Sequence, residues 1–456
     1  LPLYNDLPKF NADELARQFN VTAKHSIEKM AAAYHDAFLT VSDITANECK
    51  YLLGREPDGV TPNGFENDFV WAGEEYYAKR DEARRAMISV AEACLGHKFR
   101  KEPLIVGTSR YEFRNKGIDV FIESLKQLAA SDRLRREVLA YIPVPAGNRG
   151  PRLDLQAHLA DPSKPIDAGQ YRHSTHYLEN ATWDPIVNAL KNSNLTDPGS
   201  KVKVIFVPTY LNKADGIFHK DYYELLVGMD ITVFPSYYEP WGYTPLESVA
   251  FSIPTVTTTL AGFGIWVDKQ REHAGVEVIR RDDYNDKEVE AKIADTLLRF
   301  SLLDEKHVNE QHTSAYEISL TALWEHLFAA YEQAYSEAVE SSIVRTNRAV
   351  LDGGTKTEQI NFVRQQLFVE KPVWNRMMVD KTLPKRLHAL EELSRNLWWC
   401  WNPGARDLFE GIDPALWAES DRNPIAFLDK MSVERMKELE KDTNFLAQLD
   451  AVHTQF

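Results

Sequence analysis

Five short apolar runs, separated by helical patterns, constrain the fold of this 456-residue chain more than any other feature. Each run is rich in Val, Ile, Leu or Thr, and most are followed by apolar residues spaced three or four apart. Apolar strands that alternate with helices are typical of a parallel sheet covered on both faces. We therefore predict an α/β, Rossmann-like unit with strands at 104–107, 138–144, 202–208, 231–234 and 254–259.

The carboxyl ends of these strands are where a ligand is expected, because open parallel sheets bind ligands at that edge. The loops that form it follow Val106, Val207, Phe234 and Val256. The longest motif of the chain, from Phe234 to Glu247, lies in one of these loops and in the helix that follows it.

Two interpretations of this motif compete. Thr244, Pro245 and Glu247 match a capping box, with Thr at the N-cap, Pro at the first helical position and Glu at the third. In the functional interpretation, Glu239 and Glu247 are two site carboxylates, and the backbone N–H groups near Gly242 bind an anion. That spacing suits an enzyme that binds a nucleotide diphosphate and stabilises a sugar cation.

Composition excludes several classes of function. The net charge of −15 argues against nucleic acid or an anionic membrane surface as the main partner. No apolar run approaches the ~20 residues that span a bilayer, so we expect a cytoplasmic protein. The three cysteines lie far apart and predict free thiols. His173, His176 and Glu179 have metal-like spacing, but a polar helix face is the favoured interpretation, and we predict no metal site.

Four segments follow from changes of pattern along the chain. Residues 1–102 are mostly helical with one strand candidate at 37–42, and the α/β unit occupies 103–345, including a polar insertion at 147–182 and two long helices after 286. Residues 346–383 are predicted to be a linker, and 384–456 a short helical unit that contains Trp398, Trp399 and Trp401.

The run from Phe234 to Pro245 resembles the signature of eukaryotic-type glycogen synthases, which are retaining glucosyltransferases that use UDP-glucose. Further matches in the same order extend the resemblance over roughly residues 5 to 340: Arg110–Gly117, Thr175–His176, Asp184–Ile186 and Leu260–Gly264. It implies a GT-B fold, with 1–102 as the end of the N-terminal lobe and 103–345 as the C-terminal, nucleotide-sugar-binding lobe. It also implies glucose transfer from UDP-glucose or ADP-glucose to the non-reducing end of glycogen or another α-1,4-glucan.

The resemblance assigns roles to residues of this chain. Glu239 and Glu247 become the catalytic carboxylates, and Glu247 also binds the ribose. For Glu239, attack as a nucleophile and stabilisation of the cation during same-face attack both remain open. The substrate-binding residues are Arg110, Lys116, Tyr222, Tyr210, Gly242, Tyr243, Thr244 and Lys29. Lys29 stands where the family has an arginine, and Ala23 stands where the family has a histidine.

The chemistry predicted for the synthase needs no cofactor. Many nucleotide-sugar enzymes neutralise the diphosphate with a metal held by an Asp-x-Asp pair, which is absent from this sequence. Cationic side chains and helix N-terminal N–H groups are then expected to neutralise the diphosphate. The acidic to neutral stretch 304–311 further predicts no activation by glucose 6-phosphate, because the family's sensor helix is rich in arginine.

Residues 384–456 resemble the start of bacterial α-glucan phosphorylases, so we expect a fusion in which pyridoxal phosphate belongs to the absent phosphorylase portion. We also expect the protein to continue beyond both Leu1 and Phe456. A homo-oligomer is among the expected assemblies. Two alternatives are a retaining GT-B transferase with a small acceptor and a non-catalytic glucan-binding module, and the second is disfavoured because the charged site residues are present.

Overall fold

The computed structural model describes residues 2–109, 112–166, 169–270 and 274–353. It contains two compact units, Leu1–Ala334 and Tyr335–Phe456, and every strand of the described residues lies in the first. The predicted unit at 384–456 lies outside the described residues. Helix α13 (Trp324–Gly353) occupies the first eight positions of the predicted linker, so a linker that starts at 346 is wrong.

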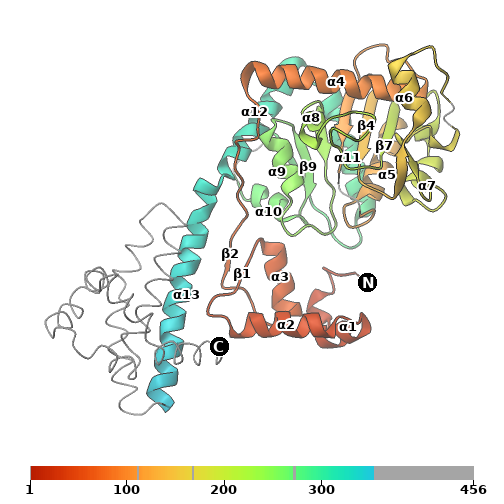
Figure 1. The fold of residues 1–456 in the computed structure, drawn as a ribbon. Coiled ribbons are helices and arrows are strands. Elements are labelled where there is room, and N and C mark those ends of the chain that lie inside the picture. Colours follow the sequence, from red (N-terminus) through yellow and green to blue (C-terminus); the bar gives the residue numbers. More distant parts are fainter. Residues whose placement is uncertain (1, 110–111, 167–168, 271–273, 354–456) are drawn as a thin grey trace, which may run out of the picture. The chain divides into compact units, whose positions relative to one another are not determined.

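A six-stranded parallel sheet forms the centre of the first unit (Figure 1), in the order β10-β9-β8-β3-β4-β7. The predicted α/β class and the five predicted strands are confirmed. The short run that forms β10, which contains Glu277, was not predicted. The strands are β3 (Leu104–Gly107), β4 (Val138–Pro143), β7 (Val202–Val207), β8 (Ile231–Val233), β9 (Thr255–Thr258) and β10 (Val276–Ile279).

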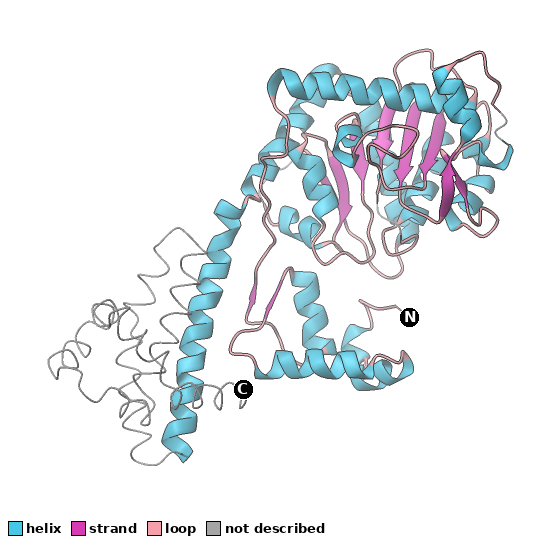
Figure 2. Ribbon diagram, in the orientation of Figure 1, coloured by secondary structure: helices cyan, strands magenta, loops and turns pink. Residues whose placement is uncertain are grey.

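Helices cover both faces of the sheet (Figure 2), because successive strand residues point to opposite faces. Leu104 and Val106 belong to one buried cluster, whereas Ile105 belongs to the other. Burial of each such side chain stabilises the fold by roughly 1.5–3 kcal/mol. One cluster contains α5 (Ile118–Ala129), α7 (Pro185–Lys191) and α11 (Asp286–Ser301), and the other contains α4 (Gly73–Leu95) and α8 (Tyr222–Leu226).

Helix α4 corrects the predicted boundary at residue 102. Met87, Val90 and Leu95 of this helix are buried in the same cluster as Ile105 of the sheet. Arg84 reinforces the contact, since it donates to Gly228 O at 2.9 Å and pairs with buried Asp230 at 2.8 Å. Helix α4 therefore belongs with the sheet and not with the end of the N-terminal lobe.

A third buried cluster lies beside the sheet and includes Trp241 and Phe263. It joins α9 (Tyr243–Ala250), α10 (Gly262–Asp268) and α12 (Glu305–Thr321). The region after 286 thus contains α11, α12 and α13, and the prediction of two long helices is wrong.

The remaining elements lie before the sheet, in the insertion, and between α7 and β7. Ser42 is the N-cap of α3 (Asp43–Leu52), because its hydroxyl accepts from the backbone N–H of Thr45 in a capping box. Among the described residues, no helix is long and apolar enough to cross a membrane. These elements are η1 (Leu7–Lys9), α1 (Ala12–Gln18), α2 (Thr22–Tyr34), β1 (Leu39–Thr40), α3 (Asp43–Leu52), β2 (Gly59–Val60), β5 (Asn148–Pro151), α6 (Leu153–Ala160), η2 (Gly169–Tyr171), β6 (His176–Leu178) and η3 (Asn194–Thr196).

His312 of α12 gives the fold a pH dependence that can be measured. Burial, with Arg80 as the second cause, lowers the pKa of His312 to about 4. In the unfolded chain its pKa is about 6.5, so between these values the unfolded state binds a proton that the folded state does not. We expect protonation of this histidine in the unfolded chain to lower the free energy of unfolding by about 2 kcal/mol at pH 5 relative to pH 7.5.

Urea unfolding of the His312→Gln variant at both pH values checks this expectation. The variant should lose less stability than the parent protein when the pH falls. His307→Gln is the control, because His307 lies on the same helix but pairs with Asp304 at the surface. Equal losses in the parent protein and in His312→Gln would contradict the expectation.

Candidate functional site

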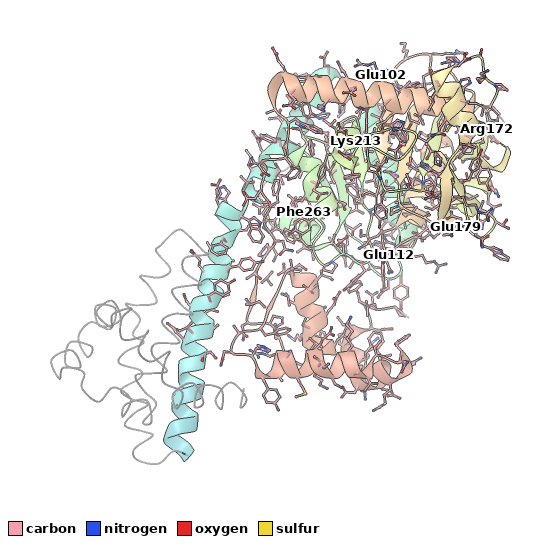
Figure 3. The ribbon with its side chains drawn as sticks, in the orientation of Figure 1. Glu102, Glu112, Arg172, Glu179, Lys213 and Phe263 are labelled. Atoms are coloured by element: carbon pink, nitrogen blue, oxygen red, sulfur yellow. The ribbon has the colours of Figure 1, made fainter. Side chains whose placement is uncertain are left out.

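The topology of the sheet creates a switch point between β3 and β8. After β3 the chain adds β4 and then β7 on one side of β3. It then returns and places β8 on the other side of β3. The loops after these two strands diverge, which leaves a crevice at their carboxyl ends. Figure 3 shows Glu102, before β3, and Glu112, after it, at opposite ends of this part of the molecule.

The loop after β8 is held firmly by the loop after β3. Asn115 O accepts from the N–H groups of Tyr237 at 2.8 Å and Tyr238 at 3.1 Å. Gly117 has a φ of +70°, and a Cβ at this position would meet Pro235 O at 2.0 Å. A residue without a side chain is therefore required where the two loops touch.

The loop after β9 fixes the same segment from the other side. Gly262 N donates to Glu239 O at 3.0 Å, and Glu239 N donates to Leu260 O at 3.3 Å. The glycine-rich segment Leu260–Gly264 is thus a backbone support for Glu239. A Cβ on Gly262 would meet Pro240 O at 2.2 Å, which explains a glycine there.

Lys116 and Glu239 join the two loops of the switch point through a buried ion pair. Lys116 Nζ lies 2.9 Å from Glu239 Oε2, and the two side chains are 8% and 9% exposed. The ammonium also donates to Tyr238 O at 2.9 Å. An ammonium has three N–H donors, and the described residues fill two of them. Because a buried charge is costly without a partner, each residue holds the other in place.

A cavity of about 920 Å³ opens at this edge of the sheet. Its wall is made by the loops after β3, β4 and β7 and by the first turns of α8 and α9. Among the residues that line it, the ones predicted from the sequence are Lys116, Tyr210, Tyr222, Tyr243, Thr244 and Glu247.

The two predicted base-binding aromatics differ in their surroundings. Tyr222 is partly buried and its hydroxyl donates to Ser109 Oγ at 3.4 Å, while burial raises its pKa and keeps the hydroxyl protonated. Tyr210 is 75% exposed and lies at the rim. A ring with one open face is suited to stacking on a base.

The predicted capping box at α9 is wrong. The helix begins at Tyr243 and its N-cap is Gly242, with a φ of +114° and no side-chain cap. Thr244 is therefore the second helical residue. Glycine adopts this left-handed conformation without the steric penalty that a Cβ would cause, so the chain enters the helix two residues earlier than predicted. Glu247 accepts from the Tyr223 hydroxyl at 2.9 Å.

Four predicted residues are not among the described residues that line the cavity: Glu239, Gly242, Lys29 and Arg110. Glu239 pairs with Lys116 of the wall, and Gly242 is the N-cap of α9. Lys29 lies on α2 and pairs with Asp13 at 2.9 Å, and it does not line the cavity. His25 of the same helix also contacts Asp13, at 3.0 Å. Arg110 lies outside the described residues.

The sequence did not predict several residues of the site. Tyr223 directly follows Tyr222 in the sequence, and only Tyr222 was predicted. Ser109 lies two residues after Gly107, the last residue of β3, and it lines the cavity. Gly147 and Asn148, also in its wall, come from the insertion that was treated as polar loop, although it contains β5, α6 and β6.

The histidines of the insertion do not form a metal centre. His176 lies in strand β6, so the predicted polar helix face is wrong, and its Nε2 lies 2.9 Å from Asp215 O. Burial lowers the pKa of His176 and favours the neutral ring. Within the described ranges, no group of three or more His, Cys, Asp or Glu side chains could hold a metal ion.

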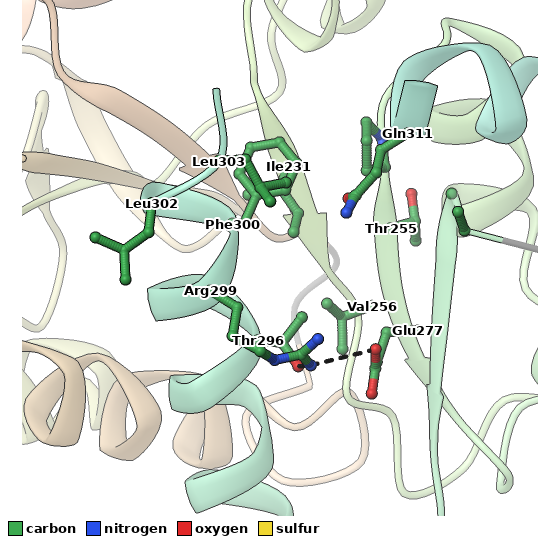
Figure 4. A pocket seen from close by; sticks show the side chains of 13 residues that line it. Ile231, Thr255, Val256, Glu277, Thr296, Arg299, Phe300, Leu302, Leu303 and Gln311 are labelled. Carbon is green, nitrogen blue, oxygen red and sulfur yellow. Dashed lines mark hydrogen bonds and ion pairs between the residues drawn. The ribbon is translucent and has the colours of Figure 1, made fainter. Parts of the chain in front are cut away.

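A second cavity, of about 320 Å³, lies at the opposite edge of the sheet (Figure 4). It adjoins the amino ends of β8 and β9, and its polar groups include Arg299 and Glu277, which lie 3.5 Å apart. None of the predicted site residues line it.

Comparison with known proteins identifies the family. The family model described as glycogen synthase matches residues 1–151 and 172–393. This chain belongs to the glycogen synthase family. A second model, described as a protein of unknown function (DUF3417), matches residues 383–456.

Curated glycogen synthases are similar over much of the chain. Isoform 1 of the glycogen (starch) synthase of Saccharomyces cerevisiae is 26% identical over 77% of this chain and 61% of its own length. The Neurospora crassa enzyme is 31% identical over 61% of this chain and 48% of its own length. The chain thus spans about three-fifths or less of these relatives. Among solved structures, sucrose-phosphate synthase from Thermosynechococcus elongatus is similar over 70% of this chain and 62% of that chain, with 14% identity and a TM-score of 0.41.

The close contact at Gly117 predicts an unequal effect of two alanine substitutions. Gly96 also has a positive φ, of +59°, but its Cβ would meet nothing within 4 Å. We expect Gly96→Ala to cost roughly 1–2 kcal/mol for the left-handed conformation alone. Gly117→Ala should cost clearly more, because Pro235 must move, and thermal unfolding of both variants measures the difference. Equal melting temperatures would show that the loops do not depend on this contact.

Proposed function

We propose that the protein transfers glucose from UDP-glucose or ADP-glucose to the non-reducing end of glycogen or another α-1,4-glucan, with retention at the anomeric carbon. The observation that carries the proposal is the buried Lys116–Glu239 pair, of which Lys116 lines the cavity together with Glu247 and Tyr222. It joins a cation suited to a diphosphate with a carboxylate suited to a sugar cation, at the switch point where such sheets bind nucleotides.

Neutralisation of the leaving diphosphate falls to Lys116 and to the start of α9. Lys116 supplies an ammonium from the wall of the cavity. Tyr243 and Thr244 begin α9, so their backbone N–H groups are among those without a partner inside the helix. Arg110 is proposed as a second cation on the resemblance of its motif. With these donors, the reaction is proposed to need no metal and no cofactor.

Glu239 acts on the sugar in this proposal. As the partner of Lys116 it is a carboxylate, and it can attack the anomeric carbon or stabilise the cation while the acceptor attacks from the side that the diphosphate leaves. Both routes retain the configuration. When the diphosphate arrives, Lys116 has two anionic partners within reach and can bind both.

The nucleotide is bound by the rest of the wall. Glu247 accepts from the ribose hydroxyls, and Tyr222 and Tyr210 pack against the base. The phosphorylase fusion with its pyridoxal phosphate, homo-oligomers and the cytoplasmic location stay predictions.

A transfer assay on the full-length protein tests the proposal. UDP-glucose and ADP-glucose are each combined with glycogen and with small sugars, with and without EDTA. We expect transfer to glycogen that EDTA does not abolish, with a loss of at least a hundredfold in Glu239→Gln, because the carboxylate charge is removed where positive charge develops.

Glu277→Gln is the matched control, because it removes a carboxylate from the cavity at the opposite edge of the sheet. Its activity should stay within about twofold of that of the parent protein, and its melting temperature within a few degrees. Glu239→Gln should melt at a lower temperature, because buried Lys116 loses its charged partner, so turnover is compared well below both melting temperatures. Near-normal turnover by folded Glu239→Gln would refute the catalytic role. Transfer to small sugars but not to glycogen would refute the proposed acceptor.

A further inference from the structure

Tyr223 makes a contact with the donor-site carboxylate that neither its sequence motif nor the family resemblance assigns. Its hydroxyl donates to Glu247 Oε1 at 2.9 Å. Tyr223 belongs to α8 and Glu247 to α9, so the bond joins two elements of the cavity wall. Tyr222, the preceding residue, lines the cavity itself, whereas Tyr223 does not.

The ring of Tyr223 packs against two phenylalanines, whose own ring centroids lie 5.8 Å apart. Phe69 stacks on it with a centroid distance of 5.0 Å and an interplanar angle of 27°. Phe251, at the end of α9, stacks on it at 5.4 Å and 29°. Stacked rings of this kind contribute roughly 0.5–1.5 kcal/mol beyond the area they bury. The hydroxyl position is therefore set by packing and not by Glu247 alone.

Helix α8 is itself held in place. Glu224 Oε2 accepts from Asp221 N at 2.9 Å, and Lys79 of α4 pairs with Glu224 Oε1 at 3.3 Å. Burial opposes ionisation of Glu224, but Lys213 and the other donors outweigh it and lower its pKa to about 2. Burial and the negative charge of Glu247 raise the pKa of Tyr223, so its hydroxyl remains a donor at neutral pH.

We propose that Tyr223 is a positioning residue that orients the Glu247 carboxylate toward the ribose of the donor. Its hydroxyl occupies one carboxylate oxygen and thereby restricts the rotation of the group that lines the cavity. A carboxylate has lone pairs enough to accept from Tyr223 and from a ribose hydroxyl at once. This inference rests on the proposed function, since it concerns the same nucleotide site.

The alternative role for Tyr223 is to satisfy a half-buried hydroxyl within an aromatic cluster. Tyr76 provides the comparison. Its ring is packed against the same cluster, and its hydroxyl donates to Phe251 O at 3.2 Å, a backbone carbonyl and not a carboxylate. Tyr76→Phe thus removes a similar hydrogen bond without touching Glu247.

The test is calorimetric titration of the full-length protein with UDP and with 2′,3′-dideoxy-UDP, or with the ADP pair if ADP binds more tightly. The parent protein should bind the normal nucleotide at least tenfold more tightly than the dideoxy form. In Tyr223→Phe the affinity for the normal nucleotide should fall about tenfold, since bonds to charged groups are the stronger ones, while that for the dideoxy form stays nearly unchanged. In the transfer assay, KM should rise with kcat within about twofold.

The outcomes distinguish a failure of the positioning role of Tyr223 from a failure of the proposed function. Tyr76→Phe should bind both nucleotides like the parent protein. If Tyr223→Phe keeps the full preference for the normal nucleotide, or loses affinity for both forms equally, the positioning role is overturned although the nucleotide site stands. If the parent protein binds neither UDP nor ADP, the proposed function itself fails.

Discussion

The buried ion pair between Lys116 and Glu239 is the interaction on which the rest of the site depends. It spans the two loops that diverge at the switch point of the sheet, and both side chains are almost completely shielded from water. Each charge would destabilise the fold without the other. The pair therefore requires a sheet that brings the ends of β3 and β8 side by side, and it places a carboxylate next to a cation.

The architecture around the pair restricts it to one geometry. Backbone N–H groups of the segment that carries Glu239 donate to Asn115 O on one side and to Leu260 O on the other. Gly117 and Gly262 allow backbones to approach where a Cβ would collide. The second carboxylate is restrained in a different way, through Tyr223 and two stacked phenylalanines. One carboxylate is thus fixed by backbone and charge, and the other by aromatic packing.

The sequence predicted the sheet because apolar strands such as Val202–Val207 are buried along their whole length, which leaves a clear signal. It predicted six of the fifteen described residues that line the cavity, because strand ends and motif residues coincide there. It failed at α9, since a glycine with positive φ starts the helix before the residues that look like a cap. Lys29 was expected in the site because it stands where the family has an arginine, but its partner in the structure is Asp13. The role of Tyr223 depends on Phe69, more than 150 residues away, and no local pattern reveals such a contact.

The central claim is that a nucleotide diphosphate binds at the carboxyl edge of this sheet with Lys116 as its cation. A crystal structure of the full-length protein with bound UDP tests it most directly. The account predicts the diphosphate between Lys116 Nζ and the first turn of α9, with the ribose on Glu247 and the base against Tyr222. UDP at the opposite edge of the sheet, or a diphosphate with no oxygen within hydrogen-bond distance of Lys116, would contradict it.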